Sequence, residues 1–368
     1  MKIYSYEVIL ALLIVVLLSW ILPKKIQMLS SSLMTMLFLI YFDSTSLFLL
    51  LFMFLSSYYS SQKYTFSTKV LLWILLLVSS ILIFYKVSIL IDASQYIMPL
   101  GVSFYSFRVI HYVFEGYKHK LPEHSMFDYF NYLFFLPTFI VGPINRFQQF
   151  HNDLYNRELK RANISWALER ILYGYTKIVI LGSYLFGIKL LIYMETIQES
   201  HSYFYHYLVS IQYWLSLYFQ FSGYSDIAIG ISALMGFKIM ENFNYPFFAK
   251  NISEFWQRWH ISLSKWIKDY VYLPIVALTR KPFLSVLVSL IIFGLWHELS
   301  INYIFWGFYH ALGITIWHKF QWIKSKNRYI RKFTDSKIFL IFSIVLTFHF
   351  VIFSFEIRTL FLQLFNLN

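Results

Sequence analysis

The amino-acid sequence predicts an all-α, polytopic membrane protein, on the strength of its composition, its apolar runs and the placement of its basic residues. Of the 368 residues, 58% are hydrophobic, 22% aromatic and only 13% charged, whereas soluble domains carry about 25% charged residues. Because a membrane-crossing helix needs about 20 apolar residues, we count roughly eleven to twelve hydrophobic segments, some of them re-entrant. Residues 1–368 are expected to form a single membrane-embedded domain.

The net charge and the lack of cysteine exclude some classes of partner and of chemistry. The formal net charge is +13, and the chain contains no cysteine. Lys and Arg fall mainly in short connections between apolar runs, where orientation in the membrane and contact with anionic lipid explain them. We therefore expect the lipid bilayer, and not nucleic acid, as the partner of the basic loops. Disulfides, thiol nucleophiles and cysteine-ligated metals are excluded.

The first half of the chain carries six apolar runs, at residues 1–22, 29–41, 46–57, 70–90, 97–114 and 127–141. The first lacks a small-residue cleavage site before Pro23 and is predicted to be a span and not a cleaved signal peptide. The second and third are short for a hydrocarbon core of about 30 Å. They are expected to tilt, to thin the bilayer or to be partly re-entrant.

The distribution of positive charge conflicts with simple alternation across the membrane. Lysines at residues 24–25, 63, 69, 118 and 120 alternate with weakly charged connections at Asp43 and Asp92. If every run crosses, the equally basic connection 145–170 lies on the side of the membrane opposite to these lysines, which the positive-inside rule does not predict. Either residues 127–141 do not cross or another segment is re-entrant, and we favour an irregular, re-entrant architecture. The absence of a fixed-spacing repeat weakens a transporter built from inverted halves.

The second half carries further apolar runs at residues 171–193, 201–221 continuing into 223–237, 283–295, 301–316 and 338–355. The basic tract 319–332 precedes the last of them.

Residues 137–146 interrupt helix geometry with Pro137, Gly142 and Pro143. One interpretation is an ordinary loop. The other is a structured cavity wall bearing Arg146, a cation suited to an anionic donor or head group.

Further along, Asp226 lies in a small-residue run that favours close helix packing, and its carboxylate must pair with a cation or face water.

Residues 242–248 predict an extended turn, and Asn251 with Glu254 is typical of a capping box that opens a helix. A helical spacing of three and four places six residues on one face of this helix: Phe255, Trp259, Leu263, Trp266, Ile267 and Tyr270. Asp269 falls on the charged face, and His260 on the border beside Trp256 and Ile267. We expect one amphipathic, interfacial or re-entrant helix.

His297 follows a run with almost no polar residue and precedes Glu298. One interpretation is an interfacial histidine at a helix end. The other is a buried neutral imidazole that accepts a proton as a general base, with Glu298 either orienting it or facing water. Because titratable rings at membrane depth are costly, His260 and His297 together form a functional-site hypothesis.

Other chemistries find little support. The eleven histidines contain no pair three or four residues apart, so no metal site is predicted. There is no G-x-S-x-G elbow, Walker loop or G-x-G-x-x-G. The S-x-x-K pattern occurs at both residues 60–63 and residues 262–265, which makes it weak support for a serine nucleophile.

The chain resembles the membrane-bound O-acyltransferase family, in particular its bacterial branch of alginate O-acetylation and teichoic acid D-alanylation proteins. The resemblance is carried, in order, by residues 99–107, 137–146, 223–226 with 228–230, 241–246, 254–272, 296–297 and 306–307. It covers about residues 99–310 and implies tilted helices around a central tunnel that joins the two sides of the membrane.

The resemblance also implies roles for particular residues. His297 is the expected catalytic histidine, and His260 the second histidine of the reaction tunnel. The other expected substrate-binding or tunnel-lining residues are Trp256, Trp259, Asp269, Asp226, Arg146, Asn302 and Glu298, with Trp259, Asn302 or His260 as candidate oxyanion donors. Glu298 stands where the family commonly has Gly, which puts donor choice, the basicity of His297 and even activity in question.

The expected function is transfer of an acyl group, most simply acetyl, from a cytoplasmic donor to a hydroxyl of an extracytoplasmic polysaccharide or wall polymer. No tightly bound cofactor is expected. The donor would be acetyl-CoA or an acylated carrier protein, and a partner acyltransferase would complete transfer outside a bacterial cell membrane. D-alanyl transfer to a teichoic acid-type polymer is the alternative within the family. A transporter and a non-catalytic scaffold are the alternatives from other classes.

Overall fold

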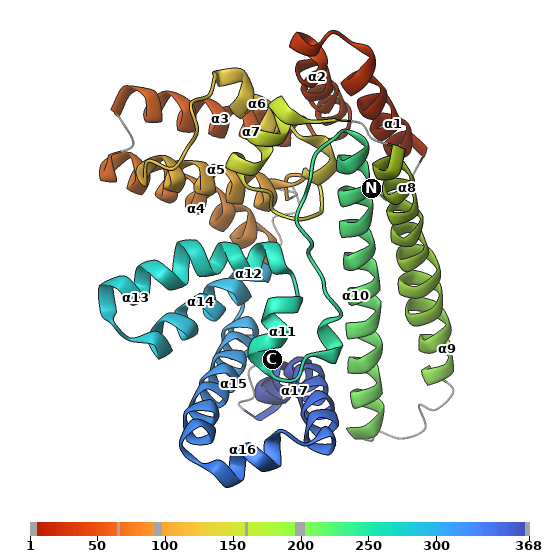
Figure 1. Cartoon of the computed structure of the whole chain (residues 1–368), viewed down its shortest axis with the longest axis vertical. Helices are drawn as coiled ribbons and strands as arrows, with labels where there is room; N and C mark the ends of the chain where they lie inside the picture. Colours follow the sequence, from red (N-terminus) through yellow and green to blue (C-terminus); the bar gives the residue numbers. More distant parts are fainter. Residues whose placement is uncertain (1–5, 65–66, 92–97, 159–160, 196–202, 365–368) are drawn as a thin grey trace. The chain divides into compact units, whose positions relative to one another are not determined.

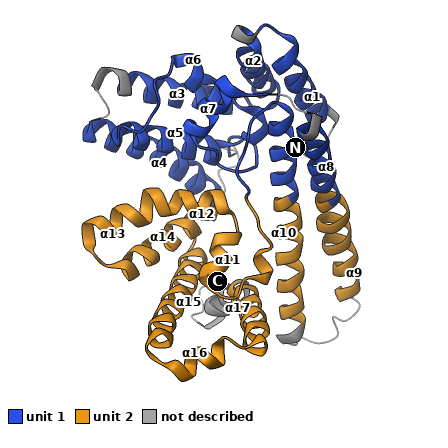
Figure 2. Cartoon of the chain, in the orientation of Figure 1, with its two compact units in different colours: residues 1–176, 223–241 blue, residues 177–222, 242–368 orange. Residues whose placement is uncertain are grey.

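The computed structural model describes residues 6–64, 67–91, 98–158, 161–195 and 203–364, and these residues form helices joined by turns, with no strand among them (Figure 1). The all-α prediction is therefore confirmed. The chain divides into two compact units (Figure 2). Unit 1 comprises residues 1–176 and 223–241, and unit 2 comprises residues 177–222 and 242–368. The expectation of a single membrane-embedded domain stays a prediction.

Unit 1 is built mainly from the first eight α-helices. They are α1 (Tyr6–Ile21), α2 (Lys24–Phe42), α3 (Ser44–Tyr64), α4 (Thr68–Leu90), α5 (Val102–Tyr117), α6 (Met126–Leu133), α7 (Phe147–Asn156) and α8 (Arg161–Tyr175), with the short 3₁₀ turn η1 (Leu136–Thr138) after α6. Helix α1 packs on α2, and α5 packs on both α3 and α4.

Unit 2 holds the later elements. They are most of the π-helical η2 (Thr176–Lys189), α9 (Leu190–Glu195), η3 (Pro246–Phe248), α11 (Ile252–Arg258), α12 (Ile261–Ile267), η4 (Lys268–Tyr272), α13 (Leu273–Thr279), α14 (Pro282–His297), α15 (Ile301–Lys326), α16 (Arg328–Thr334) and α17 (Lys337–Leu364). Helix α10 (Tyr203–Leu234) contributes residues to both units. It joins the predicted runs 201–221 and 223–237 into one helix.

Within the described ranges, three helices are long and apolar enough to cross a membrane, at Thr68–Leu90, Asn163–Met194 and Lys337–Ser354. The same ranges hold four shorter apolar helices, at Glu7–Ile21, Ile26–Phe42, Ser44–Ser60 and Pro282–His297. Helix α4 is apolar on both faces: Ile74 and Val78 are buried, while Leu76 is 68% exposed. An apolar exposed face of this kind is what contact with lipid requires, so the chain is a polytopic membrane protein.

Residues 127–141 do not form a crossing helix, which resolves the conflict in the charge distribution. Helix α6 has only eight residues, a length of about 12 Å against a core of about 30 Å. The chain beyond it stays on the same side of unit 1, because Arg157 donates to the side chain of Gln27 at the start of α2. In addition, Gln148 donates to Glu115 (3.0 Å) near the end of α5. The basic connections 118–125 and 145–158 therefore share one side of unit 1.

The stretch from Phe134 to Arg146 is a buried, structured wall and not an exposed loop. Arg108, only 1% exposed, donates to the carbonyls of Tyr132 and Leu133 (both 3.2 Å) and to Thr138. Gly142 has φ +150°, and a Cβ there would lie 2.9 Å from the Cβ of Ala228. A larger residue would therefore push this wall away from α10.

Candidate active site

His260 lies at a break between two helices, where we had predicted one continuous helix. Helix α11 ends at Arg258 and α12 begins at Ile261, and His260 between them adopts the left-handed conformation, with φ 44° and ψ 51°. This turn points the ring inward, so His260 is 1% exposed and not a border residue. The predicted apolar face was correct in its burial, because Phe255, Trp259, Leu263, Trp266, Ile267 and Tyr270 are all buried.

Asn242 holds the turn in place. The amide of Ile261 donates to the backbone oxygen of Asn242, and the amide of Asn244 donates to the oxygen of Arg258 (both 2.9 Å). These backbone bonds hold a conformation that non-glycine residues rarely adopt. The capping prediction was half right: Asn251 accepts from the amide of Glu254 (2.8 Å), but Glu254 accepts from the amide of Lys250.

The hydrogen bonds of Asn242 also define the tautomer of His260. Asn242 Oδ1 accepts from the backbone amide of Ser262 (3.2 Å) and from its hydroxyl (2.8 Å), and His260 Nδ1 lies 3.2 Å from the same oxygen. Nδ1 must therefore carry a hydrogen and donate it. In a neutral ring Nε2 is then an acceptor. This Nε2 is buried and has no partner within the part of the chain that the structure describes.

His297 is the last residue of α14, and its ring is exposed. Four aromatic rings surround it, with centroid distances of 5.4 Å to Phe293, 4.5 Å to Trp296, 5.8 Å to Tyr303 and 6.2 Å to Trp306. The side chain is therefore exposed at a helix end and not buried, and a role as general base stays a prediction.

The two histidines belong to one aromatic cluster. The ring of His260 lies 6.3 Å from Phe293 and 6.0 Å from Trp296, and both of these rings also contact His297. The cluster brings together residues 37 positions apart in the sequence. One histidine is accessible and the other is buried with an open acceptor, an arrangement suited to binding and deprotonating a hydroxyl group.

Close packing of α14 on α15 positions His297. A Cβ at Gly307 would lie 2.6 Å from the backbone oxygen of Leu290, and a Cβ at Gly294 would collide with the backbone oxygen of Tyr303. Only glycine permits these approaches. The helices therefore come together immediately before the turn that carries His297 and Glu298.

Polar atoms without partners gather in these same elements. Buried side-chain atoms that find no hydrogen-bond partner among the described residues include Trp256 Nε1, His260 Nε2, Ser289 Oγ, Ser300 Oγ, Asn302 Oδ1 and both ring nitrogens of His310. Folded proteins rarely leave such groups unmet. Their concentration on α11, α14, α15 and the adjoining turns indicates a place where a polar ligand or water binds.

Trp256 and Trp259, two of the predicted tunnel residues, contact different side chains within unit 2. Trp256 is buried and contacts Phe293 (5.0 Å), Trp306 (5.7 Å) and His310 (5.2 Å). Trp259 instead packs against Trp214 and Phe243, each 5.2 Å away. Asn302 lies in the first turn of α15, just after the turn that follows His297.

Asp269 and Glu298 are the two predicted acidic site residues of unit 2. Asp269 is half-buried in the π-helical turn η4. Glu298 is exposed and caps α14 with φ −153°. Any residue adopts such an extended backbone, so glutamate fits at this position without strain.

Arg146 and Asp226 belong to unit 1. Asp226 is buried and accepts from Arg170 Nε (2.7 Å), and Arg170 also pairs with Glu241. The carboxylate therefore pairs with a cation, one of the two outcomes expected for it. Arg146 precedes α7. A tunnel-lining role for either residue stays a prediction.

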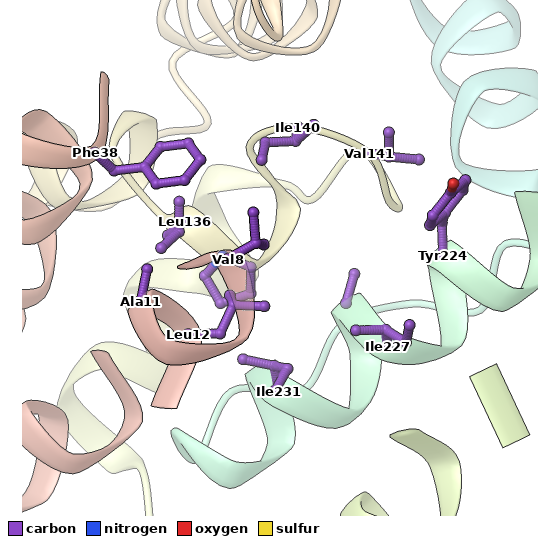
Figure 3. Close-up of a pocket in the computed structure, with 12 residues that line it drawn as sticks. Val8, Ala11, Leu12, Phe38, Leu136, Ile140, Val141, Tyr224, Ile227 and Ile231 are labelled. Carbon is purple, nitrogen blue, oxygen red and sulfur yellow. The ribbon is translucent and has the colours of Figure 1, made fainter. Parts of the chain in front are cut away.

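A small apolar crevice of about 30 Å³ in unit 1 is lined by α1, by the stretch after α6 and by α10, with Leu136, Ile140 and Ile231 among its residues (Figure 3). Neither Arg146 nor any histidine lines it. A volume of this size is about that of one water molecule, so the crevice has no room for a thioester or a sugar.

Sequence reasoning missed His310 and Asn242. His310 lies four residues after Trp306 on α15, a helical spacing that places both on one face, and the rings are 4.6 Å apart. This spacing could have identified His310. Asn242 had no such signal, because the turn that brings it to His260 spans 18 residues.

The fold and the site thus define an all-α membrane protein with paired histidines in an aromatic cluster at a helix end. The family model of the MBOAT, membrane-bound O-acyltransferase family, matches residues 3–356. The chain belongs to this family, and the resemblance seen in its motifs is confirmed.

Among the curated proteins that are similar to this chain, several are named for the modification of a polymer. The chain is 33% identical over 227 residues to a probable alginate O-acetylase of Pseudomonas aeruginosa, covering 60% of this chain and 42% of the relative. It is 32% identical over 276 residues to a teichoic acid D-alanyltransferase of Bacillus subtilis, covering 70% and 68%. A peptidoglycan O-acetyltransferase of Helicobacter pylori is 30% identical over 256 residues, covering 60% and 47%. The matched region is thus less than half of the alginate and peptidoglycan relatives.

Proposed function

We propose that this protein transfers an acyl group, most simply acetyl, from an activated thioester to a hydroxyl of an extracytoplasmic polysaccharide or cell-wall polymer. Membership of the acyltransferase family and the polymers named for its relatives support this class of reaction. The observation that carries the proposal is the pairing of exposed His297 with buried His260 across Phe293 and Trp296.

In the proposed reaction His297 is the general base. It takes the proton from the acceptor hydroxyl, the hydroxyl oxygen attacks the acyl carbonyl carbon, and the carbon–sulfur bond of the thioester breaks as the new ester bond forms. The proton then passes from His297 to the departing thiolate. The C-terminal end of α14 stabilises the imidazolium that forms between these two steps.

His260 serves this reaction as an acceptor. Its Nδ1 donates to Asn242, so its neutral Nε2 accepts a hydrogen bond from the substrate hydroxyl or from water. A neutral His260 held in this way does not act as an oxyanion donor. The indole N–H of Trp256, buried beside Phe293 and unpartnered among the described residues, is a better candidate for that role.

The remaining parts of the proposal concern donor, partner and location. The donor is acetyl-CoA or an acylated carrier protein, used as a co-substrate and not as a bound cofactor. A partner acyltransferase on the outer side completes the transfer, and the protein lies as a multi-pass protein in the cytoplasmic membrane of a bacterium. D-alanyl transfer is the second candidate, supported by the larger share of both chains that the D-alanyltransferase match covers.

The test is transfer of a radiolabelled acyl group onto polymer in membranes that contain the protein. His297→Ala is expected to reduce labelled polymer by at least about 10²-fold, the lower range of general-base contributions, because no other described base occupies its position in the cluster. His318→Ala, an exposed histidine on α15, is the matched control and should keep full transfer. Supplying acetyl and D-alanyl donors in parallel identifies the acyl group.

Full transfer by His297→Ala would refute the mechanism and favour a scaffold that supports another enzyme. Transport of substrate independent of any acyl donor would instead favour a transporter. The amount of folded protein in the membrane must be equal for each variant.

A further inference from the structure

Unit 1 contains a cavity of about 580 Å³ that is lined by none of the residues of the proposed reaction. It lies where the end of α1, the start of α2, the start of α6 and the end of α7 come together, all within unit 1 (Figure 2). Pockets that bind small molecules have volumes of about 300–1,000 Å³. The cavity therefore has room for an organic ligand.

Arg157 is a cation that lines this cavity. Its guanidinium donates to the side chain of Gln27 and to the backbone oxygen of Met235 (3.2 Å), and it lies 4.8 Å from the centre of the Trp20 ring. Its other N–H groups have no acceptor among the described residues, and no carboxylate of these residues forms an ion pair with it. Arg157 is therefore suited to bind an anion such as a phosphate group.

Asp128 supplies a negative charge to the same cavity. It is 6% exposed and accepts from the amide of Ser125 (2.7 Å) and the hydroxyl of Tyr155 (3.0 Å). His151 lies 3.9 Å from the carboxylate. Burial lowers the pKa of His151 below its ordinary value, so this ring is neutral near pH 7 and does not balance the charge of Asp128.

The two charges line one cavity but do not neutralise each other. Arg157 and Asp128 form no ion pair together, and no other described lysine or arginine pairs with Asp128. A purely anionic ligand would be repelled by Asp128, and a purely cationic one by Arg157. The charges therefore favour a ligand that carries one negative and one positive group.

The cavity lies at the level where phospholipid head groups are found. It is bounded by the end of α1 and the start of α2, which are both apolar helices. The ends of such helices lie where the hydrocarbon core meets the head groups. Met28, Leu29, Phe127 and Leu154 are apolar residues of the cavity lining. A lipid would cover this apolar surface, whereas a small soluble zwitterion would leave it in water.

An apolar stripe on α2 leads away from the cavity. Leu29 lines the cavity, and Leu33 and Leu37 follow it along α2 at a spacing of four residues. Leu33 is 48% exposed and Leu37 is 60% exposed. Because residues four apart are neighbours on a helix surface, these leucines form a continuous apolar surface that an acyl chain can cover.

We infer that this cavity binds one aminophospholipid of the phosphatidylethanolamine class. The phosphate contacts Arg157, the ammonium group contacts Asp128, and an acyl chain follows the leucine stripe of α2. The bound lipid stabilises unit 1 by joining α1, α2, α6 and α7. The inference does not depend on the proposed acyl transfer, because neither His260 nor His297 lines the cavity.

The experiment measures binding of the first lipid to purified full-length protein in detergent, by native mass spectrometry. Phosphatidylethanolamine and phosphatidylglycerol with identical acyl chains are titrated separately. The unaltered protein should bind phosphatidylethanolamine at least about tenfold more tightly, because only its head group offers a cation to Asp128. The rise in unfolding temperature that each lipid causes is measured in parallel.

Two variants test the two charges separately. Arg157→Gln should weaken binding of phosphatidylethanolamine by at least about tenfold and remove the lipid-induced rise in unfolding temperature, since a charge-assisted contact with the phosphate is lost. Asp128→Asn keeps an oxygen that can accept from the amide of Ser125 and should abolish the preference between the two lipids. Arg331→Gln, an exposed cation on α16, is the matched control and should change neither measurement.

Four results would overturn the inference. Equal binding of the two lipids by the unaltered protein would show general lipid association, and equal effects of Arg157→Gln and Arg331→Gln would show attraction without a site. The same stabilisation by phosphoethanolamine without acyl chains would assign the cavity to a soluble zwitterion. A lower unfolding temperature of Arg157→Gln with an unchanged lipid-induced rise would show that Arg157 only holds the fold.

Discussion

At the scale of single residues, the site depends on a strained histidine held by one asparagine. His260 has positive φ, and its inward orientation follows from the backbone and side-chain bonds of Asn242. Asn242 is itself 0% exposed. One buried residue therefore holds the turn through its backbone oxygen and defines the tautomer of the second histidine through its side chain.

We expect Asn242→Ala to leave the ring of His260 without the side chain that orients it. The change leaves the Nδ1 hydrogen of His260 and the amide and hydroxyl of Ser262 without their acceptor. Each buried group left unpaired costs about 1–3 kcal/mol, so we expect a lower unfolding temperature and a large loss of acyl transfer. Thermal unfolding of the purified variant and the labelled-polymer assay measure the two effects.

Asn327→Ala is the control for this prediction. Asn327 caps α16 on the exposed surface, where it accepts from the amides of Tyr329 and Ile330. Losing such a cap costs about 1 kcal/mol and should leave transfer unchanged. Normal transfer by Asn242→Ala would show that His260 needs no fixed tautomer.

At the scale of elements, the packing of α14 on α15 sets the position of His297. Gly294 lies three residues before His297, directly against the backbone of Tyr303. A backbone carbonyl cannot rotate away as a side chain can. The helices must therefore separate if any Cβ is added at this position.

Gly294→Ala is accordingly expected to destabilise unit 2 by about 1–3 kcal/mol, the usual cost of overpacking, and to reduce acyl transfer by displacing His297. Gly313→Ala is the matched control, because its new Cβ would meet the movable ring of Phe350 and not a backbone atom. Urea unfolding and labelled transfer on both variants provide the measurement. An equal effect of the two substitutions would contradict the packing argument.

At the scale of the whole molecule, the basic connections assign the sides of unit 1. Thr68, at the start of α4, contacts Tyr117 at the end of α5 (3.4 Å), so the connections before α4 and after α5 lie together. Gln148 and Arg157 join the segment after α6 to the same side. By the positive-inside rule we predict that this side faces the cytoplasm.

Single-cysteine labelling tests this topology, because the natural chain has no cysteine. Lys118→Cys and Asn156→Cys should both react with a membrane-impermeant maleimide in inverted vesicles. Ile91→Cys, at the opposite end of α4, should react in intact spheroplasts instead. Labelling of Asn156→Cys together with Ile91→Cys would mean that residues 127–141 cross the membrane after all.

Much of the fold and part of the site followed from local signals in the chain. Hydropathy predicted the apolar helices, since each needs only its own residues to satisfy its backbone in lipid. The two histidines stood out because ionisable groups in apolar runs are costly. The buried face of residues 255–270 was predicted correctly although its continuous helix was not.

The sequence by itself determined the class of protein and the family, and it predicted His260 and His297 as site residues. Only the tertiary structure decided that α11 and α12 are separated by a left-handed turn, that Asn242 fixes the ring of His260, and that His310 is enclosed with two unmet nitrogens. Apolar periodicity reports the average environment of a segment. A broken helix or a buried tautomer depends on single contacts between residues distant in the sequence, and these exist only once the chain has folded.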